Sequence, residues 1–261
     1  MILHSFLSKE ILFLLFLGMI PSIIWLCIFM RKDDHPEPKR MILLVFICGF
    51  FSVLVAAALQ WLLYKTIQYT ALPCLYCPFT ANISPTTADI TRMVVFVSIT
   101  VASMFALIEE YVKYMAARLC IVKSPYFDEP VDAMIYCITA ALGFAAAENI
   151  FYLLSDMSNV IPIIIIRFFT STLLHVFASA IVGYFFALSF IHIIYRRYYI
   201  AIGMLCAVLL HTIFNMIISA HLYLEWKSMG VFLLVLLICL SSYIVSFLFR
   251  HIKRMTFPIR M

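Results

Sequence analysis

Charged residues are scarce in this sequence. Only 12% of its 261 residues are Asp, Glu, Lys or Arg, whereas 66% are hydrophobic and the mean hydropathy is +1.09. A soluble domain carries about 25% charged residues and about half apolar ones. The composition therefore excludes an ordinary soluble protein and predicts an integral membrane protein.

Several common motifs are also missing. The chain has no Walker loop, no G-x-G-x-x-G turn and no H-E-x-x-H motif, so it lacks the signatures of P-loop, dinucleotide-binding and zincin proteins. No internal repeat is evident, which argues against the repeat architecture of many transporters. The apolar run 11–30 is too long for a signal-peptide core and no A-x-A-like site follows it. We therefore expect a first span that is retained.

The apolar residues form long continuous runs. About 20 apolar residues cross the hydrocarbon core as a helix, which predicts an all-α, polytopic transmembrane bundle of about seven spans. The expected spans are 10–30, 41–64, 92–117, 131–154, 160–194, 199–220 and 229–249. The fifth run is too long for one straight span, so it must tilt, break or continue past the membrane. We expect one membrane domain over 1–261, with a catalytic core at about 92–220.

Basic residues gather in alternate connections. The links at 30–40, 118–130 and 195–199 and the C-terminal tail hold most of the Lys and Arg found outside the spans. Because basic loops stay in the cytoplasm, we predict the N-terminus outside and the C-terminus inside. The net charge of +5 then lies on one membrane face, and the expected partner of that face is the lipid bilayer and not nucleic acid.

The third span contains three charged residues, Glu109, Glu110 and Lys113. Ionisable residues inside a span indicate a functional site by default, because lipid excludes them otherwise. Glu109 and Lys113 are four residues apart, so they are predicted to pair on one helix face and to leave Glu110 as the freer carboxylate. The alternative interpretation is a structural buried ion pair.

The fourth and fifth spans add a carboxylate and a cation. Glu148 lies with Asn149 and Tyr152 in GFAAAENIFY, where small residues allow close helix packing and direct the carboxylate into the bundle. Arg167 has no acidic residue nearby in its own span, so its partner must come from another helix. Either Glu148 or Glu110 can supply it. A purely structural interhelical hydrogen bond from Asn149 is the alternative.

Two histidines complete the set. His175 and Ser179 follow Arg167 at helical spacing, near one face. His211 and Asn215 are four residues apart in HTIFN, so the amide could orient a water or fix an imidazole tautomer. The alternative interpretation is an ordinary buried histidine for His175 and a helix–helix hydrogen bond for His211.

Carboxylates, imidazoles and an amide at membrane depth can activate water, either by acid–base chemistry or at a metal site. Imidazole and carboxylate suit Zn²⁺, and a zinc site would use Glu148, His175 and His211. A nucleophilic Ser179 is disfavoured because it shares a helix with its base and no oxyanion feature is visible. A proton-coupled membrane transporter and a non-catalytic membrane immunity or scaffold protein remain alternatives.

The ordered set DDHPEP, EEYVK, GFAAAENIFY, HVFAS and HTIFN resembles the PrsW family of intramembrane proteases, over roughly residues 30–220. This family is related to the CAAX prenyl endopeptidases and the Abi-type proteins. The resemblance implies a bacterial or archaeal plasma-membrane endopeptidase. Its substrate would be a membrane-anchored protein such as an anti-sigma factor, or a prenylated or single-span protein or peptide.

By similarity, the catalytic residues are Glu109, Glu110, Glu148, His175, His211 and Asn215, and the supporting residues are Lys113, Arg167, Asn149, Tyr152 and Ser179. The resemblance leaves the zinc and glutamate mechanisms both open. The DDHPEP turn is a loose form of the family's acidic-proline turn and is assigned no chemistry. Cys74 and Cys77, in the CLYC loop, match nothing in the family and are either unpaired thiols or a disulfide.

Overall fold

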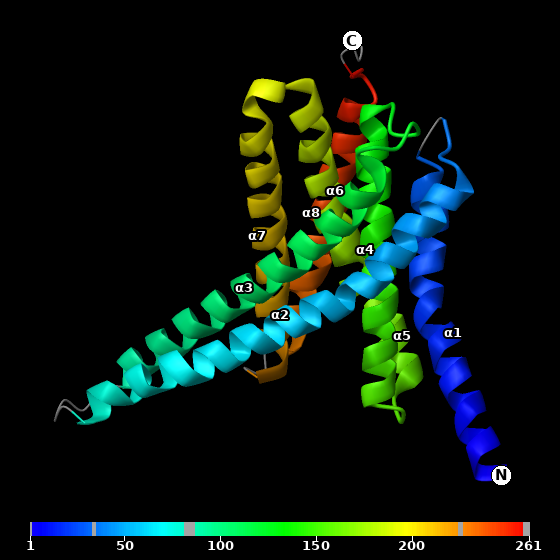
Figure 1. Ribbon diagram of the computed structural model, residues 1–261. Helices are drawn as coiled ribbons and strands as arrows, with labels where there is room; N and C mark the ends of the chain where they lie inside the picture. Colours follow the sequence, from blue (N-terminus) through cyan, green and yellow to red (C-terminus); the bar gives the residue numbers. More distant parts are fainter. Residues whose placement is uncertain (1, 33–34, 81–86, 224–226, 258–261) are drawn as a thin grey trace.

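The computed structural model describes residues 2–32, 35–80, 87–223 and 227–257, and it describes the side chains of 9–32, 35–69, 94–220 and 228–257. Over these residues the chain forms helices and connections without a strand (Figure 1), so the all-α prediction is confirmed. The helices are α1 (Ile2–Met30), α2 (Lys39–Thr80), α3 (Thr87–Ile121), α4 (Pro130–Ser155), α5 (Val160–Phe169), α6 (Ser171–Ile191), α7 (Arg196–Tyr223) and α8 (Lys227–Ile252), with a 3-10 turn, η1 (Ile193–Tyr195).

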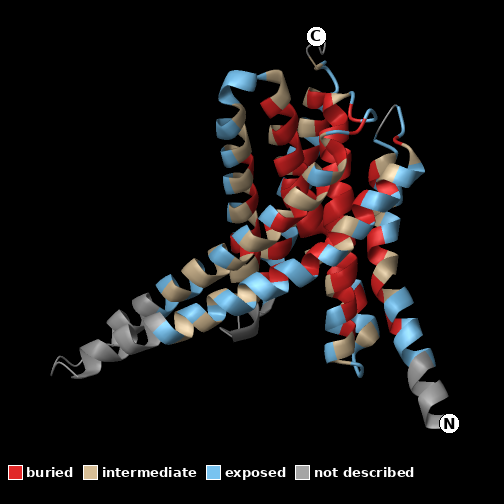
Figure 2. Cartoon of the chain, viewed as in Figure 1, coloured by how far each residue is buried: buried red, intermediate tan, exposed pale blue. Residues whose placement is uncertain are grey.

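Within the described residues, seven helical stretches are long and apolar enough to cross a membrane. Large hydrophobic side chains such as Leu54, Phe96 and Phe232 are exposed on the outside of the bundle. Figure 2 shows that the buried residues gather along the middle of the bundle and that exposed ones follow its outer helices. This pattern is expected where lipid contacts the outer surface, and it confirms a multi-pass membrane protein.

The central helix is α4. Most of its residues are buried, and α1, α2, α3, α5, α6 and α8 all pack against it. A Cβ atom on Gly49 of α2 would clash with the carbonyl of Ala140, and one on Gly143 of α4 would clash with the carbonyl of Phe46. The backbones of α2 and α4 therefore meet at these two glycines. This close packing brings the second half of α4 into the bundle interior.

The overlong fifth run breaks, which was one of the three predicted outcomes. Thr170 separates α5 from α6 with φ −118° and ψ −88°. The break leaves carbonyls at the end of α5 without helical partners, and the Trp25 indole of α1 donates to the Phe168 carbonyl at 3.0 Å. Arg167 and His175 therefore lie on two differently directed helices, and the predicted single continuous face is wrong.

The second span is longer than predicted. Residues 65–80 were expected in a loop but continue α2, because residues 65–72 contain neither glycine nor proline to end a helix. α2 and α3 pack against each other as an antiparallel pair that crosses the bundle obliquely and extends beyond it (Figure 1). Cys74 and Cys77 lie outside the residues whose side chains the structure describes.

The basic connections lie at one end of the bundle. The link between α3 and α4, the link between α6 and α7 and the end of α8 are all at the top of Figure 1, as is the end of α1. The predicted alternation of basic and non-basic connections is consistent with this arrangement. Assignment of the basic end to the cytoplasm stays a prediction from the loop charges.

Candidate active site

Six helices contribute polar side chains to one connected cluster inside the bundle. Contacts at 2.6–2.9 Å link Arg167 to Glu148, then His175, then Lys113, then Glu110 and finally His211. Glu109 extends the cluster from His211 towards α2. Residues that are far apart in sequence thus meet at one place, as the single-site prediction requires.

Glu110 is the structural glutamate of the pair. Lys113 Nζ donates to Glu110 Oε1 at 2.7 Å, and His211 Nδ1 contacts the same oxygen at 2.7 Å. The Glu110 side chain is 0% exposed and that of Lys113 is 1% exposed. The prediction that Lys113 pairs with Glu109 and leaves Glu110 free is therefore wrong. Both the three- and the four-residue spacing allow a helical ion pair, and the contact with α7 favours the three-residue one.

The hydrogen bonds of the cluster fix the tautomers of both histidines. Lys113 carries only donors, so His175 Nδ1 at 2.9 Å from Lys113 Nζ accepts, and His175 Nε2 donates to Glu148 at 2.9 Å. A carboxylate only accepts, so His211 donates to Glu110 from Nδ1. Neutral His211 then presents a bare Nε2 lone pair, whereas both ring nitrogens of His175 are engaged.

Glu148 is held by Arg167 as well as by His175. Arg167 donates from its terminal nitrogen to Glu148 Oε2 at 2.6 Å and from Nε to Asn149 Oδ1 at 2.6 Å. The guanidinium also lies over the Tyr152 ring, 4.0 Å from its centroid. The predicted partnership between Arg167 and a carboxylate of another helix is confirmed, and α4 supplies that carboxylate.

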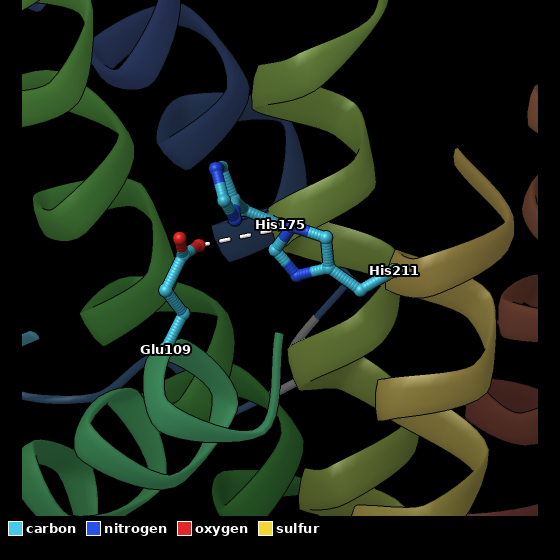
Figure 3. A group of neighbouring side chains, drawn as sticks. All are labelled: Glu109, His175 and His211. Atoms are coloured by element: carbon cyan, nitrogen blue, oxygen red, sulfur yellow. Dashed lines mark ion pairs between the residues drawn. The ribbon is translucent and has the colours of Figure 1, made fainter. Parts of the chain in front are cut away.

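Glu109 is the carboxylate with unused capacity. Its Oε1 accepts a hydrogen bond of 2.9 Å from Gln60 Nε2 on α2. Its Oε2 is buried, has no hydrogen-bond partner among the described residues and lies 3.7 Å from His211 Nε2. Figure 3 shows Glu109 on α3 pointing towards the two imidazoles, which come from α6 and α7. A carboxylate oxygen without a hydrogen-bond partner among the described residues therefore faces Nε2 of His211.

The sequence of the chain matches a known protein family. The family described as "PrsW family intramembrane metalloprotease" matches residues 37–243. The chain belongs to the PrsW family. It is 28% identical to "Protease PrsW" of Geobacillus kaustophilus (strain HTA426) over 84% of this chain and 85% of that protein. It is also 28% identical to "Protease PrsW" of Clostridioides difficile (strain 630) over 87% and 86%. No solved structure matches the chain.

PrsW membership makes the protein a protease of the bacterial membrane. This decides against the transporter and the non-catalytic scaffold as its main function. It also agrees with the position of the cluster, because every cluster residue lies in a helical stretch apolar enough to cross a membrane.

A divalent cation fits this PrsW site. Glu109, His175 and His211 each offer a ligand atom, and these atoms lie within 4.8 Å of one another. The unpartnered Glu109 Oε2 and the bare Nε2 of neutral His211 are ready donors. Neutral His175 would offer Nδ1 once Lys113 Nζ moved away from that atom, and it would keep its Nε2–H on Glu148. Three carboxylates face two cations in the cluster, so one negative charge remains for a cation to balance. The predicted zinc set had Glu148 in place of Glu109. Glu109 is the carboxylate that lies close enough to both histidines to share an ion, and Glu148 already accepts from Arg167.

Two predicted residues stand apart from the cluster. Asn215 is half-buried one turn after His211, and none of the described residues is hydrogen-bonded to its side chain. Ser179 is buried at 3% exposure one turn after His175, but no hydrogen bond joins its hydroxyl to the cluster residues. Gln60 is the site residue that the sequence analysis missed. Its signal was an amide in AAALQWLLY, within an apolar span.

The DDHPEP turn has a structural role at the basic end of the bundle. Buried Glu37 accepts a 2.5 Å hydrogen bond from the Tyr136 hydroxyl of α4, which anchors the link before α2 to the central helix. Glu37, Asp128 and Asp132 also lie close enough to share an ion. However, Asp132 already accepts from the backbone amides of Asp128 and Glu129, at 3.1 and 2.7 Å, as part of the capping box that starts α4.

Proposed function

We propose that this cluster hydrolyses a peptide bond of a membrane-anchored protein, with Glu109 as the base that activates water. The observation that carries the proposal is the unpartnered Glu109 Oε2, 3.7 Å from His211 Nε2. Ionised Glu109 accepts at Oε2 and neutral His211 accepts at Nε2, and a water has two hydrogens to donate. A water held by both would have its oxygen lone pairs free to attack a carbonyl carbon.

The water-binding groups are supported by fixed neighbours. Glu110 holds His211 through Nδ1 and so keeps the Nε2 lone pair directed at the water, which is the orienting role of a buried carboxylate behind a histidine. Lys113 balances the Glu110 charge at 2.7 Å. Lys113 forms its ion pair with Glu110 and not with Glu109, so the Glu109 carboxylate can accept a proton.

The reaction then balances within the site. The water oxygen bonds to the carbonyl carbon as its proton passes to Glu109 Oε2, and the carbon–nitrogen bond breaks as Glu109 returns that proton to the leaving amine. We assign the stabilisation of the tetrahedral oxyanion to the Asn215 amide, because its N–H donors are unused and it lies one turn from His211. One such donor contributes about 100- to 1,000-fold in rate.

In the metal-dependent form of this mechanism, Glu109, His175 and His211 would hold a Zn²⁺ ion. A bound zinc makes hydroxide available near neutral pH and polarises the peptide carbonyl. Glu148 would then orient His175, as carboxylates behind metal-bound histidines commonly do. In both forms, Glu110 would fix His211, and the Asn215 amide would supply a donor to the developing oxyanion.

The proposed substrate is a membrane-anchored protein such as an anti-sigma factor, or a prenylated or single-span protein. Glu148 and Glu109, at 23% and 14% side-chain exposure, open the cluster to its surroundings more than the other charged residues of the cluster do. His175 and His211 are nearly covered, at 2% and 4%. A soluble folded protein could not deliver a peptide bond to this depth, whereas an extended segment next to a membrane anchor could.

The test uses the full chain reconstituted in liposomes with a single-span substrate. Glu109→Gln and His211→Ala are expected to lose cleavage. The matched controls Glu10→Gln and His192→Ala change exposed residues far from the cluster along the chain, and they should keep it. Cleavage at the native rate by both site variants would refute the proposal.

A further inference from the structure

Gln60 is an unusual residue for its place in α2. Its neighbours Leu59 and Trp61 are 42% and 62% exposed on the outer surface of the bundle, where lipid is the solvent. An amide without a partner in such surroundings costs about 1–3 kcal/mol by mutational data. Gln60 is half-buried and has a partner on another helix, Glu109.

The hydrogen bond between these residues has a defined direction. A carboxylate only accepts, so the Gln60 amide must present its NH₂ group to Glu109 Oε1, at 2.9 Å. The terminal torsion of a glutamate is broad and roughly two-fold, so an unrestrained carboxylate rotates its two oxygens. The bond from α2 anchors Oε1 and leaves Oε2 directed towards His211 Nε2.

A neutral donor suits this task better than a cation would. Lys or Arg at position 60 would form an ion pair with Glu109. Such a pair would stabilise the ionised carboxylate and oppose the proton transfer to it. An amide fixes the orientation of the carboxylate and leaves the charge available. The ionisable groups around Glu109 are Glu110 and Lys113 on its own helix and Glu148, His175 and His211 on other helices, and none of them provides a neutral donor to Oε1.

We propose that Gln60 is a positioning residue of the proteolytic site, which acts by fixing the Glu109 carboxylate with Oε2 towards His211. The proposal rests on the proposed role of Glu109 in hydrolysis. It assigns α2 a part in the site, although the nearest family-like motif, DDHPEP, ends before α2 begins. It also couples the position of the oblique pair α2 and α3 to the geometry of the reacting groups.

The kinetic test compares the same substitution at two glutamines of one helix. Gln60→Met keeps the side-chain length and removes the donor. The control is Gln68→Met, two turns further along α2. It removes a hydrogen bond of 2.8 Å from Gln68 Nε2 to the Tyr64 hydroxyl. In liposomes, Gln60→Met should lower kcat about 10- to 100-fold and change KM less than about two-fold, because it misplaces a reacting group. Gln68→Met should change neither.

The spectroscopic test does not depend on activity. The carboxylate bands of Glu109 are identified in infrared difference spectra as those lost in Glu109→Gln. They should shift in Gln60→Met and in Gln60→Leu and stay unchanged in Gln68→Met. Gln60→Glu places an acceptor where a donor is needed, so it should lower kcat at least as much as Gln60→Met.

The outcomes separate this proposal from the proposed function. Unshifted Glu109 bands with unchanged kcat in Gln60→Met would overturn the positioning role. Equal losses of kcat in Gln60→Met and Gln68→Met, with no band shift, would overturn it as well. If Glu109→Gln itself cleaves at the native rate, the function proposed for Glu109 fails, whereas shifted bands in Gln60→Met would still establish the contact.

Discussion

Glu109 and Glu110 are adjacent in sequence, and the structure predicts opposite consequences when each is changed to glutamine. Glu110 is fully buried and accepts from both Lys113 and His211 at 2.7 Å. Glu110→Gln leaves the Lys113 ammonium buried without a counter-ion. Breaking a buried pair on one side costs about 3–5 kcal/mol of folding free energy.

Glu109→Gln should leave the fold almost intact. The new side chain keeps an oxygen that accepts from Gln60, and position 109 has no ion pair with Lys113 to lose. Its loss of stability should stay below the roughly 1 kcal/mol of a typical hydrogen bond. Turnover should fall about 100- to 10,000-fold, the usual contribution of a general base, which corresponds to about 3–5 kcal/mol of activation free energy.

Two measurements on the same preparations separate the effect of each substitution on stability from its effect on turnover. Denaturant titration in mixed micelles gives the loss of unfolding free energy, and cleavage of a single-span reporter in liposomes gives kcat. The double variant Glu110→Gln/Lys113→Met, which removes both partners of the pair, should recover most of the stability lost in Glu110→Gln. The reasoning is wrong if Glu110→Gln is as stable as the native protein, or if Glu109→Gln unfolds as readily as Glu110→Gln.

Three further predictions follow from the packing and the charges. Gly143→Val should lower the unfolding free energy by about 1–3 kcal/mol, because its Cβ would lie 2.1 Å from the Phe46 carbonyl of α2. Melting should show a smaller loss for Gly203→Val, where the nearest atom would be the Phe185 Cβ at 2.7 Å. Arg167→Met should destabilise by about 1–3 kcal/mol by removing a 2.6 Å partner of Glu148, and adding Glu148→Gln should restore part of that loss. In the zinc-dependent form, metal analysis should find one zinc per chain and His211→Ala should lose it. Full activity of metal-free protein would refute that form.

The fold was largely predictable because lipid imposes a simple rule on sequence. A helix needs about 20 apolar residues to cross the membrane, so the seven spans could be located from the apolar runs alone. Their ends were less predictable. The continuation of α2 past its predicted end depends on residues 65–72, which contain neither glycine nor proline. The break at Thr170 occurs without Pro or Gly, and the Trp25 indole of a distant helix satisfies a carbonyl beside it.

The site was predictable as a set of residues but not as a set of pairs. Helical spacing allows Lys113 to reach either glutamate, and only the contact of His211 with Glu110 makes Glu110 the buried partner. That contact joins residues 101 positions apart, so local spacing cannot predict it. Gln60 was missed for a related reason, since a lone amide in a span is informative only once its partner is known.

The arrangement explains how the membrane tolerates so many charges at one place. Each buried charge except one is matched by a close opposite charge: Glu110 by Lys113, and Glu148 by Arg167. Glu109 is the exception, and it is also more exposed than Glu110, at 14% against 0% for the side chains. A residual charge at the opening of the cluster can be offset by a water, a proton or a cation. The paired charges hold the histidines in place, and the unpaired one is left to react.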